Sequence, residues 1–163
     1  NIKCRASGLR PNGVVLVATV RALKWHAGLD PRQARKEDPQ ATALGCANLG
    51  KHIENARKFG VPVVVAINRF KFDTEAELDV VKKYALAAGA FDCVVSNHWA
   101  EGGAGAVALG QALLKAVATP SNFKLLYAND MSLSGKIETI CKDIYGARHV
   151  EYLNGSDSLL TKY

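Results

Sequence analysis

Several features of nucleotide-binding and membrane proteins are missing from this chain of 163 residues. No G-x-x-x-x-G-K-[ST] loop, which cradles nucleotide phosphates in P-loop enzymes, occurs in it. No apolar run approaches the roughly 18 residues of a membrane span, since the run from Val14 to Val20 ends at Arg21. Neither a signal peptide nor an initiator Met opens the chain. We therefore expect a soluble piece of a longer protein, without a membrane partner.

Cysteine is also scarce, and the four residues present are widely spaced with no C-x-x-C pair. This spacing is wrong for a zinc knuckle and sparse for a disulfide scaffold, so we interpret them as reduced thiols and expect no metal site. The net charge is +6, but the Lys and Arg residues are scattered rather than clustered. Small polyanionic ligands account for such a charge as well as a nucleic acid does.

What the chain does contain is a buried strand followed by a polar loop. Val63 to Ile67 is a short, β-branched, apolar run, which indicates a strand buried on both faces. Thr74 and Glu77 then match a capping box that opens a helix, with Asp73 as an alternative cap. The loop of residues 68–75 therefore lies at the carboxyl end of a parallel strand, where open α/β sheets bind ligands.

Strands and helices are expected to alternate along the chain. Strands are predicted over residues 13–20, 63–67, 91–96 and 123–127, with a further short one at 149–153. Helices are predicted over 41–59, from the capping box to 89, over 106–117 and over 133–145. Inward faces are assigned on the first two helices to Leu44, Ala47, Leu49, Ile53, Ala56, Leu78, Val81, Tyr84, Ala85 and Ala88. The pattern predicts one α/β segment over 1–163, with a three-layer, mostly parallel sheet and helices on both faces.

A glycine-rich turn follows the third predicted strand. Gly102, Gly103 and Gly105 stand between that strand and the next helix, so their N–H groups suit an anion-binding nest. An ordinary tight turn explains them equally well. The G-x-G-x-x-A match within the turn is a weak dinucleotide signal, because no acidic residue ends the following strand.

Two aromatic side chains are expected at the edge formed by the strand ends. Phe70 follows the central strand and Trp99 follows the next one. A flat heteroaromatic ligand stacking on them is one interpretation, and packing beneath the loops is the other. His98 has no assignable nucleophile or carboxylate partner, so we expect an orienting hydrogen bond from it, and the catalytic residue stays unknown.

Six blocks of this sequence form a recognisable pattern: IKCRxSGL at 2–9, VATVRALK at 17–24, KHIENARKFGVPVVVAIN at 51–68, DTEAEL at 73–78, AGAFD at 88–92 and HWAEGGxGA at 98–106. In these blocks the chain resembles the formate–tetrahydrofolate ligase family. This enzyme, also named 10-formyltetrahydrofolate synthetase, occurs alone or as the synthetase domain of C1-tetrahydrofolate synthase. Nearly the whole chain takes part, as an internal section of the family's length.

The resemblance implies an ATP-dependent ligase of one-carbon metabolism and purine biosynthesis. It joins formate to tetrahydrofolate through formyl phosphate, using ATP with Mg. In the family, aromatic residues hold the pteridine ring, and these positions fall on Phe70 and Trp99. Val95 stands at an aliphatic contact, and Lys71 stands where some members carry a proline. The P-loop part of the P-loop NTPase-like core lies outside these residues, so the piece alone is expected to be inactive.

The resemblance also implies partners and a location. The partners are the small substrates and the rest of the parent polypeptide, with a homo-oligomer left open and no nucleic acid or covalently bound cofactor. A cytoplasmic location is expected, with the mitochondrion as the alternative.

Two rival functions remain at this stage. Asn68-Arg69-Phe70-Lys71 is similar to the N-K-x-D turn of GTPases, which suggests a fragment of a regulatory P-loop-type NTPase. Lys71 stands in place of the aspartate and cannot accept the N–H groups of guanine. The other rival is a non-enzymatic, basic nucleic-acid-binding module. The absence of interleaved basic and aromatic residues on one strand counts against it.

Overall fold

The computed structural model of the chain describes residues 1–30, 32–153, 155–160 and 162. The chain divides into two compact units, one formed by Arg10–Phe123 and the other by Asn1–Leu9 with Lys124–Tyr163. In the described part, none of the helices has the length and apolar character that crossing a bilayer requires. That residues 1–163 are one segment of a larger ligase domain stays a prediction.

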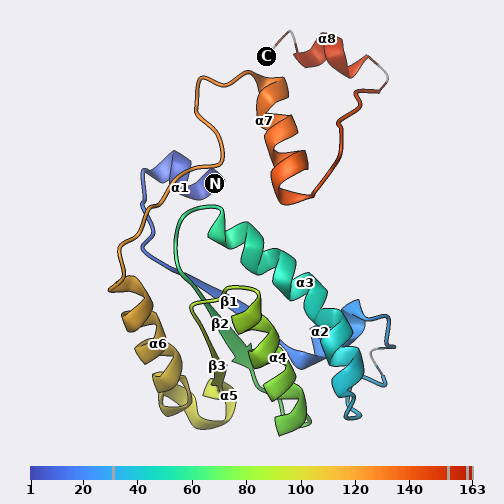
Figure 1. The fold of residues 1–163 in the computed structure, drawn as a ribbon, viewed down its shortest axis with the longest axis vertical. Coiled ribbons are helices and arrows are strands. Elements are labelled where there is room, and N and C mark those ends of the chain that lie inside the picture. Colours follow the sequence, from blue (N-terminus) through green and yellow to red (C-terminus); the bar gives the residue numbers. More distant parts are fainter. Residues whose placement is uncertain (31, 154, 161, 163) are drawn as a thin grey trace. The chain divides into compact units, whose positions relative to one another are not determined.

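The unit Arg10–Phe123 is built on a three-stranded parallel sheet (Figure 1). Strand β2 (Val63–Asn68) lies between β1 (Val14–Ala18) and β3 (Asp92–Ser96). Val64 of β2 is the register partner of both Val15 and Asp92. Every residue from Val63 to Ile67 is at most 2% exposed, so the predicted strand buried on both faces is confirmed. The α/β class with a parallel sheet is confirmed with it.

Helices cover both faces of this sheet. One face packs on α2 (Val20–His26), α3 (Pro39–Arg57) and α4 (Glu75–Ala87), in a core that includes Leu23, Ile53, Val65, Ile67, Val81 and Cys93. The other face packs on α6 (Val107–Val117), through Val64, Val94, Ala112 and Ala116. Figure 1 shows α6 on one side of the strands and α3 with α4 on the other.

Two predicted strands are absent from the described residues. Residues 123–127 and 149–153 form no strand there, and β1 and β3 each pair only with β2. Both segments have apolar residues suited to a strand, but a strand also requires a neighbouring edge that satisfies its backbone groups. Sequence pattern alone does not supply that edge.

The predicted inward faces of the helices are partly wrong. Leu49, Ile53, Leu78, Val81 and Ala85 are buried, whereas Leu44 is 71% exposed and Ala47 and Tyr84 are also exposed. The reason lies in the small residues Gly45 and Cys46, which are both buried on α3. A Cβ at Gly45 would lie 1.8 Å from Leu23 O of α2, so the two helices cross there backbone to backbone. This close crossing turns Leu44 toward solvent.

The second unit is mainly helical. It contains α1 (Ile2–Ser7), α7 (Leu133–Thr139) continued by a π-helical turn (Ile140–Ile144), and α8 (Ser156–Leu160). The guanidinium of Arg5 lies 4.5 Å from the centre of the Tyr127 ring and donates to Tyr127 O at 2.6 Å. The predicted helix over 133–145 is therefore present, although none of its residues is fully buried.

The start of α4 is fixed by the predicted capping box. Thr74 Oγ1 accepts from Glu77 N at 3.4 Å, and Glu77 Oε2 accepts from Thr74 N at 3.1 Å. Thr74 is thus the cap, and Asp73 closes the preceding turn instead. Because both groups of the box are engaged, the loop after β2 enters α4 at a defined angle.

Glu77 also forms a buried ion pair with Lys24 of α2. The two side chains are 0% and 1% exposed. Lys24 Nζ donates to Ala34 O at 3.2 Å and to Lys36 O at 2.7 Å, while Glu77 Oε1 accepts from Asp38 N at 2.8 Å. The pair therefore joins α2, residues 34–38 and the first turn of α4.

The charge state of Glu77 follows from these contacts. Burial raises the pKa of its carboxyl, but the Lys24 ammonium and the N–H groups of Asp38 and Thr74 outweigh burial, so the pKa lies below its ordinary value. A carboxyl with a lowered folded pKa stabilises the fold above its ordinary pKa of about 4.3. The stabilisation is lost as the pH falls through the lower folded value.

We expect Gly45→Ala to destabilise the chain, because the new methyl group would meet the backbone of Leu23. Overpacking of this kind costs about 1–3 kcal/mol. Gly110→Ala on α6 is the matched control, since a Cβ there has no neighbour within 4 Å. It should gain up to about 1 kcal/mol from helix propensity. Urea midpoints measure both variants, and equal midpoints would contradict the close crossing.

We expect Lys24→Met to lower the free energy of unfolding by about 3 kcal/mol, because it leaves the Glu77 carboxylate buried without its cation. The double variant that also carries Glu77→Gln should recover part of that loss. Its free energy of unfolding should fall less between about pH 5 and pH 3 than that of the unmodified chain. The control is Lys58→Met, which breaks a partly exposed pair with Glu54 and should cost under about 1 kcal/mol. Equal losses for the two Lys variants, measured by urea denaturation, would contradict the role of the buried pair.

Candidate functional site

The loop after β2 holds Phe70 at the carboxyl end of the sheet. Phe70 N donates to Asp73 Oδ2 at 2.8 Å, and Asp73 N donates to Phe70 O at 3.0 Å, so the turn is closed twice. Burial raises the pKa of the Asp73 carboxyl above its ordinary value, and the Phe70 N–H acts in the opposite direction. Arg69 N donates to Ser96 O at 3.1 Å, which ties this loop to the end of β3.

Trp99 lies on the short helix α5 (His98–Glu101), directly after β3. Asn97 N donates to Gly105 O at 3.0 Å, which closes the segment that carries the indole. His98 Nδ1 is 3.0 Å from Ser96 Oγ, in agreement with the expected orienting hydrogen bond. The Trp99 side chain itself is 82% exposed. Exposure of so large an apolar ring leaves its faces available for contact.

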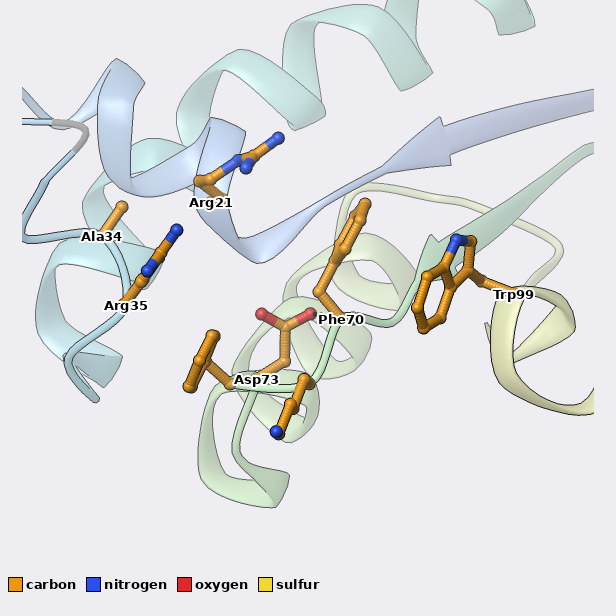
Figure 2. Close-up of a pocket in the computed structure, with 8 residues that line it drawn as sticks. Arg21, Ala34, Arg35, Phe70, Asp73 and Trp99 are labelled. Atoms are coloured by element: carbon orange, nitrogen blue, oxygen red, sulfur yellow. Dashed lines mark hydrogen bonds between the residues drawn. The ribbon is translucent and has the colours of Figure 1, made fainter.

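Phe70, Lys71 and Trp99 line one cavity of about 340 Å³ (Figure 2). Its other walls come from residues 72 and 73 and from two segments earlier in the chain, through Arg21 and Arg35. Figure 2 shows the Phe70 ring between Arg21 and Trp99. A volume in this range is at the lower end of those found for small-molecule sites. The two predicted aromatic residues therefore share one opening at the sheet edge.

The other predicted site residues lie elsewhere. Val95 packs against the core between the sheet and α3 with α4, and it does not line the cavity. Gly102, Gly103 and Gly105 belong to a 3₁₀ turn over Gly102–Ala106 and do not line it either. A Cβ at Gly105 would lie 2.5 Å from the Asn97 carbonyl, so this glycine is required by a close approach of the backbone. An anion role for the turn stays a prediction.

Two cationic side chains of the cavity were not among the predicted site residues. The Arg21 guanidinium lies 5.4 Å from the centre of the Phe70 ring, and that of Arg35 lies 5.5 Å from the centre of the Phe72 ring. Arg21 could have been found, since the sequence placed it at the end of the first strand. Arg35 could not, because its stretch has no periodicity from which a face can be assigned.

The described residues offer little covalent or metal chemistry. Burial raises the pKa of the Cys46 thiol to about 11 and that of the Cys93 thiol to about 12, so both stay neutral at neutral pH. Across the described ranges, no group of three His, Cys, Asp or Glu side chains is placed to hold a metal ion.

Comparisons with known proteins agree on one family. The family model described as "Formate--tetrahydrofolate ligase" matches residues 1–163. "C-1-tetrahydrofolate synthase, cytoplasmic" of Mus musculus is 55% identical over 161 residues, covering 94% of this chain and 17% of that protein. "Formate--tetrahydrofolate ligase" of Paracoccus denitrificans is 50% identical over 153 residues, covering 94% of this chain and 27% of that protein.

The name of a third relative includes the mitochondrion instead of the cytoplasm. "C-1-tetrahydrofolate synthase, mitochondrial" of Saccharomyces cerevisiae is 49% identical over 159 residues, which cover 93% of this chain and 16% of that protein. Across these three relatives, the chain thus spans from about a sixth to about a quarter of the protein that it matches. The match over its whole length places the chain in the formate–tetrahydrofolate ligase family.

Proposed function

We propose that this chain is the folate-binding part of a longer, ATP-dependent ligase that joins formate to tetrahydrofolate and gives 10-formyltetrahydrofolate. The observation that carries the proposal is the shared cavity of Phe70 and Trp99. Their positions at the ends of β2 and β3 put two rings beside one opening at the ligand-binding edge of a parallel sheet.

A flat pterin suits this opening physically. Phe70 is 38% exposed and Trp99 is 82% exposed, so a planar ligand between them would remove apolar area from water on both sides. Stacking adds on the order of 1 kcal/mol for each ring beyond that burial. The Arg21 guanidinium lies 5.4 Å from the centre of the Phe70 ring, which lies between Arg21 and Trp99 (Figure 2).

Asn68, the last residue of β2, carries a buried Oδ1 without a hydrogen-bond partner among the described residues. It does not line the cavity of Phe70 and Trp99, so no ligand contact is assigned to it. Lys71 lines the cavity and takes part in the proposal, whereas a contact from Val95 would require the ligand to reach below the loop.

The phosphate chemistry is assigned to the rest of the ligase. The residues present do not fit ATP with Mg, because the sequence has no P-loop and the described residues contain no acidic metal-binding group. The relatives are about four to six times as long as the matched stretch, which leaves ample chain for the P-loop part of the core. This division assigns folate binding to the chain and formyl phosphate formation to the remainder.

In the full-length ligase, Trp99→Ala and Phe70→Ala should each raise the Kd for tetrahydrofolate about tenfold or more, because each removes a stacking surface. The Kd for ATP should change little. Trp25→Ala is the matched control, since its indole is 64% exposed on α2 and does not line the cavity. Titration with each ligand measures these effects, and unchanged folate affinity in both variants would exclude the stacking site.

The isolated chain should form no 10-formyltetrahydrofolate from formate, ATP and tetrahydrofolate, whereas the full-length polypeptide should form it. The reason is that the chain lacks a loop for the transferred phosphate. The absorbance of the product after acid conversion follows the reaction in both samples. Turnover by the isolated chain at a rate near that of the full-length polypeptide would overturn the proposed division.

A further inference from the structure

The cavity of Phe70 and Trp99 has a third aromatic residue, to which the proposed pterin slot gives no role. Phe72 lines the same cavity, and its side chain is 51% exposed. Ala34, which is almost fully buried, adds a second apolar surface to the lining. Single exposed apolar side chains are common on proteins, but a ring that lines a cavity can bury its area against a ligand.

The turn that carries Phe72 and the side chain of Arg35 both restrict this ring. Two hydrogen bonds close the turn, from Phe70 N to Asp73 Oδ2 at 2.8 Å and from Asp73 N to Phe70 O at 3.0 Å. The Arg35 guanidinium lies 5.5 Å from the centre of the Phe72 ring. About half of the side chain stays exposed in spite of these contacts, so the ring is both held and accessible. A ring held in advance loses less entropy when a ligand binds.

Phe72 belongs to the end of the cavity that is away from Trp99. Its ring lies beside Arg35, and Figure 2 shows Arg35 on the far side of Phe70 from Trp99. The cavity therefore offers two apolar subsites, one between Phe70 and Trp99 and the other at Phe72 with Ala34. A ligand that fills both subsites must carry two ring systems joined by a short linker.

We propose that Phe72 and Ala34 bind the p-aminobenzoyl ring of tetrahydrofolate and so hold its N10 atom in position. This inference rests on the proposed function. In tetrahydrofolate, a methylene group and N10 join the pterin to the aryl ring. With the pterin between Phe70 and Trp99, an aryl ring fixed at Phe72 restrains the nitrogen between them, which receives the formyl group. Phe72 is thereby a residue that selects pterins with an N-aryl group.

The decisive variant is Phe72→Ala in the full-length ligase, titrated with two uncharged probes that differ in the aryl ring. The probe 6-(anilinomethyl)tetrahydropterin has the ring and no carboxylate, whereas 6-methyltetrahydropterin lacks both. The Kd for the anilinomethyl probe should rise about three- to tenfold, because the variant removes an aromatic contact and its buried area. The Kd for the methyl probe should not change. The same ratio is expected at low and high salt, since neither probe carries a charge.

Two further variants and one control keep this test independent of folding. Phe72→Tyr retains the ring and should bind the anilinomethyl probe as the unmodified ligase does, whereas Phe72→Leu should lose less than Phe72→Ala. The matched control is Phe91→Ala, which removes a 42% exposed ring just before β3, at the amino end of the sheet and outside the cavity lining. It should leave the Kd of both probes unchanged.

The position of N10 gives a second readout. At saturating tetrahydrofolate, Phe72→Ala should lower kcat about threefold or more, because a nucleophile that is held less firmly reaches its reactive geometry less often. The KM for ATP and for formate should stay the same, and Phe72→Tyr should restore kcat. An unchanged kcat in Phe72→Ala would overturn the positioning of N10.

The outcomes separate this inference from the proposed function. A Phe72→Ala variant that binds the anilinomethyl probe with full affinity, or that loses both probes equally, would overturn the aryl subsite while leaving the stacking slot intact. Failure of the proposed function shows elsewhere, as unchanged binding of the methyl probe in Trp99→Ala and Phe70→Ala.

Discussion

The arrangement of the site depends on one buried ion pair, Lys24 with Glu77. Removing two charges from water is costly, and such a pair persists only where further hydrogen bonds satisfy both groups. Here the ammonium also donates to two carbonyls of residues 34–36, and the carboxylate accepts from Asp38 N and Thr74 N. A single interaction thereby fixes the segment of Arg35 and the loop that carries Phe70.

The sheet supplies the other half of the geometry. Neighbouring parallel strands end side by side about 4.8 Å apart, so the residues that follow them lie within reach of one ligand. The turn at Phe70, which two hydrogen bonds close, and the short helix α5 with Trp99 hold the two rings so that both line one cavity. The core beneath is a buried cluster of Val, Ile, Leu, Ala and Cys side chains, which holds the strands that carry these two segments.

The sequence was sufficient to predict the parts of the fold that local chemistry determines. β2 is recognisable because it is uniformly β-branched and apolar, and α4 because its cap uses two adjacent side-chain bonds. The strand predicted at 123–127 is absent, because a strand forms only where a neighbouring strand offers backbone hydrogen bonds, and the sequence of the segment does not show whether one is there. The inward position predicted for Leu44 was wrong, because the close contact of Gly45 with the backbone of α2 sets which face of α3 is buried. That contact cannot be seen from the sequence of α3 alone. Arg35 was missed because only the buried ammonium of a distant lysine fixes its position.

The ion pair of Lys24 with Glu77 and the cavity respond differently to pH and salt, because the pair is buried and the charged side chains of the cavity are exposed. Glu77 has a lowered pKa and no exposure, so its carboxylate stays charged at neutral pH, and the buried pair is little affected by salt. Arg21 and Arg35 lie at the surface, where their attraction for an anion is screened. The rings of Phe70 and Trp99 carry no charge and do not titrate. Near neutral pH the buried pair and the two aromatic rings are thus insensitive to ionic conditions, and Arg21 and Arg35 are the cavity residues whose interactions salt can weaken.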